Sequence, residues 1–188
     1  MGRLTGTTVA FVTSMSGIED AELAVPWSVV RDEGGTPVLV APELGEVATV
    51  EHGCDPVATY PVGRLLHGVV ALEFDALVLP GGTVNGDRLR ILPAARELVR
   101  GFTEAGKPVA AICHAPWVLI DAGVAPGKTL TSAPSVGTDL RNAGATWVDA
   151  EVFVDRAGGW TLVTSRGPDD LPAFCTMLVD VVAEAAGQ

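Results

Sequence analysis

Four short runs of the chain are almost continuously apolar, and none alternates between apolar and polar positions. They span residues 7–14, 36–42, 74–82 and 107–113 and are rich in valine, alanine, leucine and isoleucine. A strand that is buried on both faces has this pattern, because neither row of its side chains meets water. We therefore expect these runs to be strands in the interior of a largely parallel sheet.

The segments between these runs place apolar residues at helical spacing. Residues 19–35 and 92–107 both follow this pattern, and both have glycine at or just before their end, a residue that readily adopts the left-handed conformation found just past a helix. Residues 150–165 predict a hairpin around Gly158, and residues 167–187 predict a closing helix. Strands that alternate with helices predict an α/β fold, with a doubly wound, mostly parallel sheet sandwiched by helices.

The composition is that of an ordinary globular protein. The chain has 188 residues, of which 48% are hydrophobic and 19% charged, and no apolar run approaches the ~18 residues that a membrane span requires. There is no internal repeat, linker or low-complexity tract, so we expect one domain over residues 1–188. Twelve basic and twenty-three acidic residues give a net charge of −11, which makes nucleic acids and anionic membranes unfavourable partners.

The cysteine pattern predicts a cytoplasmic protein with reduced thiols. The three cysteines, an odd number without CxxC spacing, are Cys54, Cys113 and Cys175. The N-terminus has no basic segment followed by a long apolar core, as a secretory signal would. The three histidines, His52, His67 and His114, show no metal-ligand spacing. Because glycine-rich nucleotide motifs are also missing, we expect neither a metal nor an organic cofactor.

Polar residues and glycines follow three of the predicted strands. The segment 16–22 comes after the first strand, Gly81 and Gly82 end the third, and Cys113 and His114 end the fourth. In a doubly wound sheet, ligands bind outside the carboxyl ends of the strands. We therefore look for the chemistry of this protein among these residues.

Cys113 lies where the fourth strand passes into a helical pattern. The first turn of a helix has unpaired N–H groups that favour a thiolate, and the neighbouring alanines permit the tight turn of a nucleophile elbow. Cysteine is also among the most buried residue types, so a small structural thiol fits the position equally well. Position alone leaves both interpretations of Cys113 open. Cys54 and Cys175 lack this context, and we expect them to be inert.

The residues near Cys113 have similarly open interpretations. His114 is a general base, a contributor of its backbone N–H to an oxyanion hole, or a solvated or capping histidine, since adjacent residues on a helix do not face each other. The glycine pair at 81–82 either brings backbone amides to a substrate carbonyl or forms an ordinary turn. A protonated Glu19 could donate a hydrogen bond to a thiolate, or it could cap the following helix.

Several segments together resemble one known family. They are "GIEDAEL", "FDALVLPGG", "GKPVAAICHAPWVLIDAGV", "LTSAPSVGTDLRNAGATWVDAEVFVD" and "VTSRGPDDLPAF". In order and spacing they are similar to the PfpI family of intracellular cysteine proteases, which shares a superfamily with the parkinsonism-associated deglycase and has a class I glutamine amidotransferase-like fold. The resemblance runs from about Val9 to Met177. It implies a flavodoxin-like sheet with a nucleophile elbow at Cys113.

The resemblance also implies roles for individual residues. Cys113 matches the nucleophile, and His114 the histidine that follows it. Glu19 matches the acid that contacts the nucleophilic sulfur, and Gly82, with the backbone of His114, matches the oxyanion-binding position. Asp87 is the nearest match to an acid that reaches the histidine from a neighbouring subunit, although this segment is one residue longer than in the archaeal proteases. The family assembles into homo-oligomers, so we expect a dimer or a hexamer.

These features predict a cysteine hydrolase that acts on an acyl or carbonyl carbon. For the family this chemistry is peptide hydrolysis or the removal of glyoxal and methylglyoxal adducts, so the expected substrates are small carbonyl compounds, peptides or proteins. Two alternatives from other classes are a cysteine redox sensor that is oxidised without turnover and a stress-related, chaperone-like protein in which the cysteine is incidental.

Overall fold

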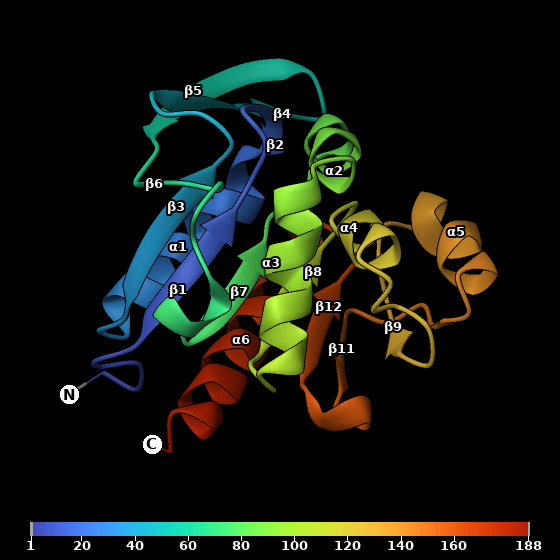
Figure 1. The fold of residues 1–188 in the computed structure, drawn as a ribbon. Helices are drawn as coiled ribbons and strands as arrows, with labels where there is room; N and C mark the ends of the chain where they lie inside the picture. The colour runs from blue at the N-terminus through green and yellow to red at the C-terminus, as the bar shows by residue number, and fades with distance from the viewer. Residues whose placement is uncertain (1, 188) are drawn as a thin grey trace.

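The computed structural model describes residues 2–187, and a seven-stranded sheet runs through its centre (Figure 1). Across the sheet the strands lie in the order β11 (Val152–Asp155), β12 (Leu162–Ser165), β8 (Val109–Ile112), β7 (Ala76–Leu79), β1 (Thr8–Val12), β3 (Thr36–Ala41) and β6 (Arg64–Leu65). Each pair of neighbours is parallel except β11 and β12, which are antiparallel. The prediction of a doubly wound, mostly parallel α/β sheet is therefore confirmed.

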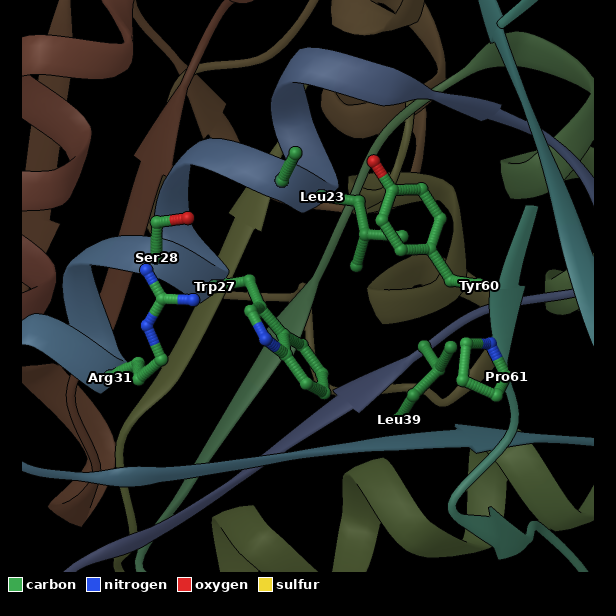
Figure 2. A pocket seen from close by; sticks show the side chains of 8 residues that line it. Leu23, Trp27, Ser28, Arg31, Leu39, Tyr60 and Pro61 are labelled. Atoms are coloured by element: carbon green, nitrogen blue, oxygen red, sulfur yellow. The ribbon is translucent and has the colours of Figure 1, made fainter. Parts of the chain in front are cut away.

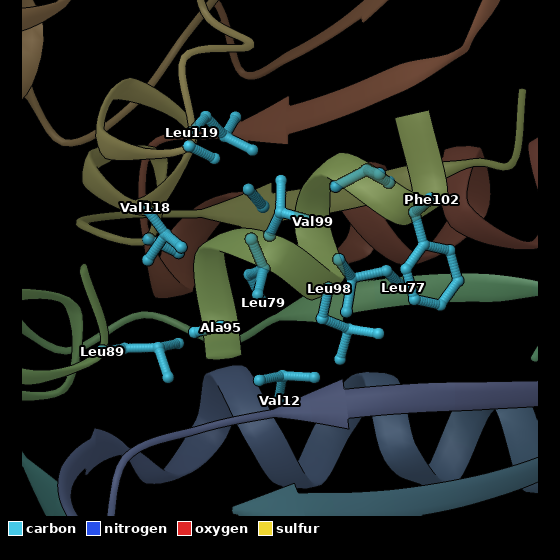
Figure 3. Close-up of a cluster of buried hydrophobic side chains, with 14 of the residues drawn as sticks. Val12, Leu77, Leu79, Leu89, Ala95, Leu98, Val99, Phe102, Val118 and Leu119 are labelled. Carbon is cyan, nitrogen blue, oxygen red and sulfur yellow. The ribbon is translucent and has the colours of Figure 1, made fainter. Parts of the chain in front are cut away.

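Helices cover both faces of this sheet. α1 (Asp20–Asp32) and α6 (Leu171–Ala185) pack on one face, and α3 (Pro93–Glu104) and α4 (Pro116–Asp121) pack on the other, with α2 (Thr83–Arg90) and α5 (Gly137–Asn142) beside α4. Strand β1 shows why its sequence is continuously apolar. Ala10 and Val12 belong to the core under α3, whereas Val9 and Phe11 belong to the core under α1 and α6. Figure 3 shows the first of these cores, with Val12 and Phe102 among its members.

The helix ends follow local rules of the chain. α3 begins with Pro93, whose fixed φ suits the first helical position. Two residues beyond the ends of α1 and α3, Gly34 and Gly106 have φ of 85° and 69°, a conformation that other residues adopt at a cost. Among the helices of the described chain, none is long and apolar enough to cross a membrane.

The C-terminal part also follows its prediction. β11 and β12 pair as a hairpin, joined by a short helical turn at Ala157–Gly159 in which Gly158 has φ of 72°. The turn Pro168–Asp170 leads directly into α6. β12 also pairs with β8 in parallel, which ties the hairpin to the centre of the sheet.

Several shorter elements were not predicted from the sequence. A separate sheet consists of β2 (Ser16–Glu19), β4 (Glu46–Glu51) and β5 (Asp55–Pro61), and two further short strands, β9 (Thr129–Leu130) and β10 (Thr146–Trp147), pair with each other. Helical turns at Ala71–Glu73 and Pro134–Val136 complete the elements. β5 was missed because it is mostly exposed, so burial leaves little pattern in its sequence.

The segments that follow β1, β7 and β8 meet at one edge of the central sheet. The backbone N–H of Glu19 donates to the carbonyl of Gly81 at 3.3 Å. The buried Asn85 joins the same segments, because its side chain accepts from the N–H of Ser14 at 2.7 Å and donates to the carbonyls of Pro80 and Gly81. This edge, where Cys113 ends β8, is where the chemistry was expected.

Candidate active site

Cys113 occupies the sharp turn between β8 and α4. Its φ is 62°, in the left-handed region that costs a residue with a Cβ about 1–2 kcal/mol. Neighbouring segments hold this conformation, because the N–H of Cys113 donates to the carbonyl of Ser165 at 3.0 Å and its carbonyl accepts from the N–H of Ala133 at 2.8 Å. A strained residue that is held from both sides is typical of functional sites. The backbone thus has the geometry expected of a nucleophile elbow.

Backbone amides surround the sulfur of Cys113. Burial raises the pKa of the Cys113 thiol above its usual range, and the charge of an ionised Glu22 would raise it further. The N–H groups of Gly82 and His114 donate hydrogen bonds toward the sulfur and act in the opposite direction. Gly82 has φ of 97° and precedes α2, so its backbone can approach where a side chain could not. These are the two amides that were expected at the oxyanion position.

Glu22 is the carboxyl group that lies at Cys113. It is completely buried, and neither of its oxygens makes a well-formed hydrogen bond to a nitrogen or oxygen of residues 2–187. Burial, together with the charge of nearby Glu19, raises the pKa of Glu22 to about 8, against the smaller opposing effects of the Cys113 sulfur and the nearby N–H of Gly81. Glu22 is therefore mostly protonated at neutral pH and has a proton to donate to the sulfur.

The prediction that Glu19 contacts the sulfur is wrong. The Glu19 carboxylate accepts hydrogen bonds from the N–H groups of His52 and Gly53, at 3.1 and 3.2 Å. Those residues form the turn between β4 and β5, which the sequence did not reveal. Glu19 is the last residue of β2, and its side chain extends toward the hairpin of β4 and β5. Glu22 lies in the first turn of α1, on the helix face that is buried in the interior.

The sequence did contain a signal for Glu22. Buried residues of α1 are Glu22, Leu23, Pro26 and Val30, which recur at the spacing of one helix face. A glutamate on the apolar stripe of a helix is exceptional, because burying a carboxylate without a partner is costly. Such a position would have distinguished Glu22 from Glu19.

His114 lies close to the sulfur even though it is the next residue in the chain. Its Nδ1 lies 3.1 Å from the Sγ of Cys113, and its Nε2 lies 3.1 Å from the Oγ of Ser135. The contact is feasible because Cys113 is not helical, so the rule for adjacent residues on a helix does not apply. Burial lowers the pKa of His114, which favours the neutral ring. The ring of Trp117 packs against it at 5.1 Å between centroids.

No described hydrogen bond within one chain joins Asp87 to these groups. It is exposed on α2, and the side chains with which the His114 ring hydrogen-bonds in the described chain are those of Thr83, Cys113 and Ser135. The role of Asp87 therefore stays a prediction that concerns a second subunit. Ser135 and Thr83 had not been singled out, because nothing in their spacing relates them to His114.

A separate pocket of about 440 Å³ lies between α1 and β5 (Figure 2). Its lining includes Leu23, Trp27, Leu39 and Tyr60, and Figure 2 shows the rings of Trp27 and Tyr60 on its walls. The lining contains no cysteine, histidine or carboxylate, so its hydroxyls, those of Ser28 and Tyr60, have no such activating group beside them in the lining. We therefore place the chemistry at Cys113. Among residues 2–187, no three histidine, cysteine or acidic side chains gather in a way that could hold a metal ion.

Comparison with known proteins gives consistent matches over most of the chain. A model described as the DJ-1/PfpI family matches residues 7–181. A deglycase from Pyrococcus abyssi is 43% identical over 171 residues, which cover 91% of this chain and 97% of that protein. The Bacillus subtilis protein YraA, whose name assigns it provisionally to the cysteine proteases, is 40% identical over 156 residues, which cover 83% of this chain and 87% of YraA.

The fold also matches solved structures. A two-domain protein from Anabaena variabilis, which contains DJ-1/ThiJ/PfpI-like and ferritin-like domains, has a TM-score of 0.84 and 32% sequence identity to this chain. The match covers 93% of this chain and 47% of the Anabaena protein. The family model, which matches residues 7–181, includes β1, β7 and β8, whose ends carry the site.

Proposed function

Because this chain belongs to the DJ-1/PfpI family, we propose that it is a cysteine-dependent deglycase that removes adducts of small dicarbonyl compounds from amines and thiols. The observation that carries the proposal is the position of Cys113. Its sulfur lies at a strained turn, with the amides of Gly82 and His114, the buried carboxyl of Glu22 and the Nδ1 of His114 around it. This arrangement suits nucleophilic attack on a carbonyl carbon.

The first step of the proposed reaction is addition of the sulfur to the carbonyl carbon. The carbon–sulfur bond forms with the sulfur electron pair, and the carbonyl electron pair moves to the oxygen. The N–H groups of Gly82 and His114 donate to this oxygen and stabilise its negative charge. Glu22, which burial keeps protonated, stabilises the thiolate before attack without adding a second negative charge.

The remaining steps move protons and release the products. In an adduct, this carbonyl forms on the carbon that carries the amine or thiol: the bond to the leaving group breaks with its electron pair, and the hydroxyl on that carbon becomes the carbonyl that the sulfur attacks. The thiol proton moves to Nδ1 of His114, 3.1 Å from the sulfur, and from there to the departing amine or thiol. For a dicarbonyl adduct, a proton also moves from one carbon of the dicarbonyl unit to the other, so one carbon becomes an acyl group and its neighbour a hydroxyl-bearing carbon. Water then releases a hydroxy acid from the sulfur and restores the thiol. No external oxidant or reductant is needed.

Peptide hydrolysis is the second candidate, and the name of the Bacillus subtilis relative favours it. The same groups would serve an amide substrate, because sulfur addition again gives a tetrahedral intermediate with a charged oxygen. The amide nitrogen then leaves with the proton from His114, and water hydrolyses the acyl-enzyme. The two candidates differ in the bond that is cleaved rather than in the residues that act.

A direct comparison of two substrates tests the proposal. The purified chain is incubated with methylglyoxal-treated N-acetyl-lysine, with release of lactate as the readout, and separately with a fluorogenic peptide. We expect lactate release, and we expect Cys113→Ser to abolish it. Cys54→Ser is the matched control, because Cys54 is an exposed thiol outside the site. Peptide cleavage that depends on Cys113, without lactate release, would establish the peptidase instead. Lactate release that survives in Cys113→Ser would exclude both.

The role of Asp87 requires a second copy of the chain. We propose that the protein forms a homo-oligomer in which Asp87 of one copy approaches His114 of another, since Asp87 is exposed on α2 and so is accessible to a partner. Light scattering after size exclusion measures the assembly, and Asp87→Asn tests the contact. A monomer with full activity, or an oligomer whose Asp87→Asn variant is fully active, would contradict this role.

A further inference from the structure

The two nitrogens of the His114 ring face different side chains. On one side Nδ1 lies 3.1 Å from the Sγ of Cys113, and on the other Nε2 lies 3.1 Å from the Oγ of Ser135. The hydroxyl of Thr83 lies 3.4 Å from Nδ1 and 3.3 Å from Nε2. A single oxygen that is almost equidistant from both nitrogens cannot lie along the hydrogen-bonding direction of either, so its contact is weak. Ser135 is therefore the stronger partner of Nε2.

The segment that carries Ser135 is fixed to the nucleophile itself. The N–H of Ala133 donates to the carbonyl of Cys113 at 2.8 Å, and the N–H of Thr131 donates to the Oγ1 of Thr164, on β12, at 3.0 Å. Ser135 follows in the helical turn Pro134–Val136, which the N–H of Val136 closes onto the carbonyl of Ala133. The Ser135 hydroxyl is therefore held at a defined place relative to Cys113.

We propose that Ser135 is a positioning residue, whose hydroxyl holds the His114 ring with Nδ1 facing the Cys113 sulfur throughout proton transfer. A hydroxyl both donates and accepts. It accepts from Nε2–H when that nitrogen carries a proton, and it donates to Nε2 when that nitrogen is bare. The ring can thus gain or lose a proton at Nδ1 without rotating. This inference rests on the proposed function only in assigning proton transfer to His114.

A hydroxyl differs from the carboxylate that orients histidine in many catalytic sites. A carboxylate, such as Asp87 of a second copy in the assembly proposed above, favours the charged imidazolium, whereas the Ser135 hydroxyl of the same chain adds no net charge and leaves the neutral ring favoured. The titratable groups around the ring agree with this. Cys113 contacts it, Glu22 lies beyond the sulfur, and Arg90 and Asp139 contact Trp117, which packs on the ring. Within one chain, the described hydrogen bonds place no carboxylate at Nε2.

Alkylation of Cys113 by iodoacetamide at pH 7 tests the proposal without a substrate. The full chain is used with Cys54→Ser, so that the exposed thiol does not react, and Ser135→Ala is compared with Ser135→Thr. Loss of one net hydrogen bond predicts a roughly fivefold slower reaction for Ser135→Ala, and Ser135→Thr restores the rate because it keeps the hydroxyl. Thr138→Ala, an exposed hydroxyl on the adjacent α5, is the control and keeps the parent rate. Equal rates in Ser135→Ala and the parent, or no restoration by Ser135→Thr, would overturn the proposal.

A second measurement follows the histidine directly. The chain has three histidines, so the ring C–H signals in proton NMR can be assigned with His114→Asn. Ser135→Asp places a carboxylate at Nε2 and should raise the titration midpoint of His114, whereas an unchanged midpoint would show that residue 135 does not contact the ring and would overturn the proposal. Neither readout requires turnover. A parent protein without lactate release would refute the deglycase proposal and leave the role of Ser135 standing. An alkylation rate of Cys113 that is unchanged in Ser135→Ala would refute the role of Ser135 and leave the deglycase proposal standing.

Discussion

The carboxyl group of Glu22 lies against the sulfur of Cys113 in the protein interior. Gly81 lies beside both residues and has no side chain that could come between them. A Cβ at Gly81 would come within 2.1 Å of Glu22 Oε2 and 2.6 Å of the Cys113 Cβ. Burial raises the pKa of this carboxyl from 4.5 to about 8. The site therefore contains an acid that keeps its proton at neutral pH because of its surroundings.

The first prediction concerns stability and pH. An acid with a raised pKa in the folded state binds more protons there than in the unfolded chain, so its effect is fully stabilising below about pH 4.5 and is lost as pH rises through about 8. Urea unfolding between pH 5 and pH 8 should show stability falling with pH. Glu22→Gln should flatten this dependence, whereas Glu51→Gln, on the exposed end of β4, should not. An unchanged slope in Glu22→Gln would contradict the raised pKa.

The second prediction tests the close packing at Gly81. Gly81→Ala should lower the free energy of unfolding by roughly 3 kcal/mol, because the new Cβ would also lie 2.8 Å from the backbone oxygen of Ile112 and the site is closely packed. Gly167→Ala is the matched control. Its Cβ would meet only Glu22 Oε1, at 3.9 Å, which is an ordinary contact. Chemical denaturation of both variants decides the point, and equal stability would contradict it.

The third prediction isolates the backbone strain at Cys113. At φ of 62°, alanine keeps the steric cost of a Cβ and glycine does not. Cys113→Gly should therefore be more stable to urea than Cys113→Ala, by about 1 kcal/mol. Within β8, the buried strand that leads into Cys113, glycine should instead be the less stable residue, so Ala111→Gly should be less stable than the parent. If Cys113→Ala is as stable to urea as Cys113→Gly, or more stable, the turn at Cys113 is not strained.

The fourth prediction concerns a buried ion pair away from the site. Nζ of Lys128 lies 3.1 Å from the Oδ1 of Asp155, donates to the carbonyls of Ala157 and Trp160, and lies over the Trp160 ring. Lys128→Met should lower the free energy of unfolding by about 3 kcal/mol, because it leaves a buried carboxylate without its cation.

A surface ion pair provides the comparison. Arg64 and Glu73 form an ion pair at 2.7 Å that is largely exposed, so Arg64→Met should leave the free energy of unfolding almost unchanged. Thermal unfolding of both variants measures the difference. A loss of stability as small in Lys128→Met as in Arg64→Met would show that the buried pair does not stabilise the fold.

Much of the fold could be predicted from local pattern. The strands β1, β7 and β8 and the second half of β3 are buried on both faces, so apolar residues fill almost every position there and the sequence records them. The hairpin of β4 and β5 could not be recognised, since β5 is mostly exposed and burial imposes little pattern on it. Missing that hairpin also concealed the partner of Glu19, whose carboxylate binds the amides of its turn.

By itself, the sequence determined that an α/β sheet forms and that Cys113 ends one of its central strands, because burial and helical periodicity are local properties of the chain. Only the tertiary structure decided which groups meet the sulfur. Glu22 rather than Glu19 reaches it because the start of α1 sets the rotation of the helix. Ser135 reaches His114 because a loop distant in sequence is hydrogen-bonded to the backbone of Cys113. Such contacts depend on the relative placement of elements, which no local pattern of residues records.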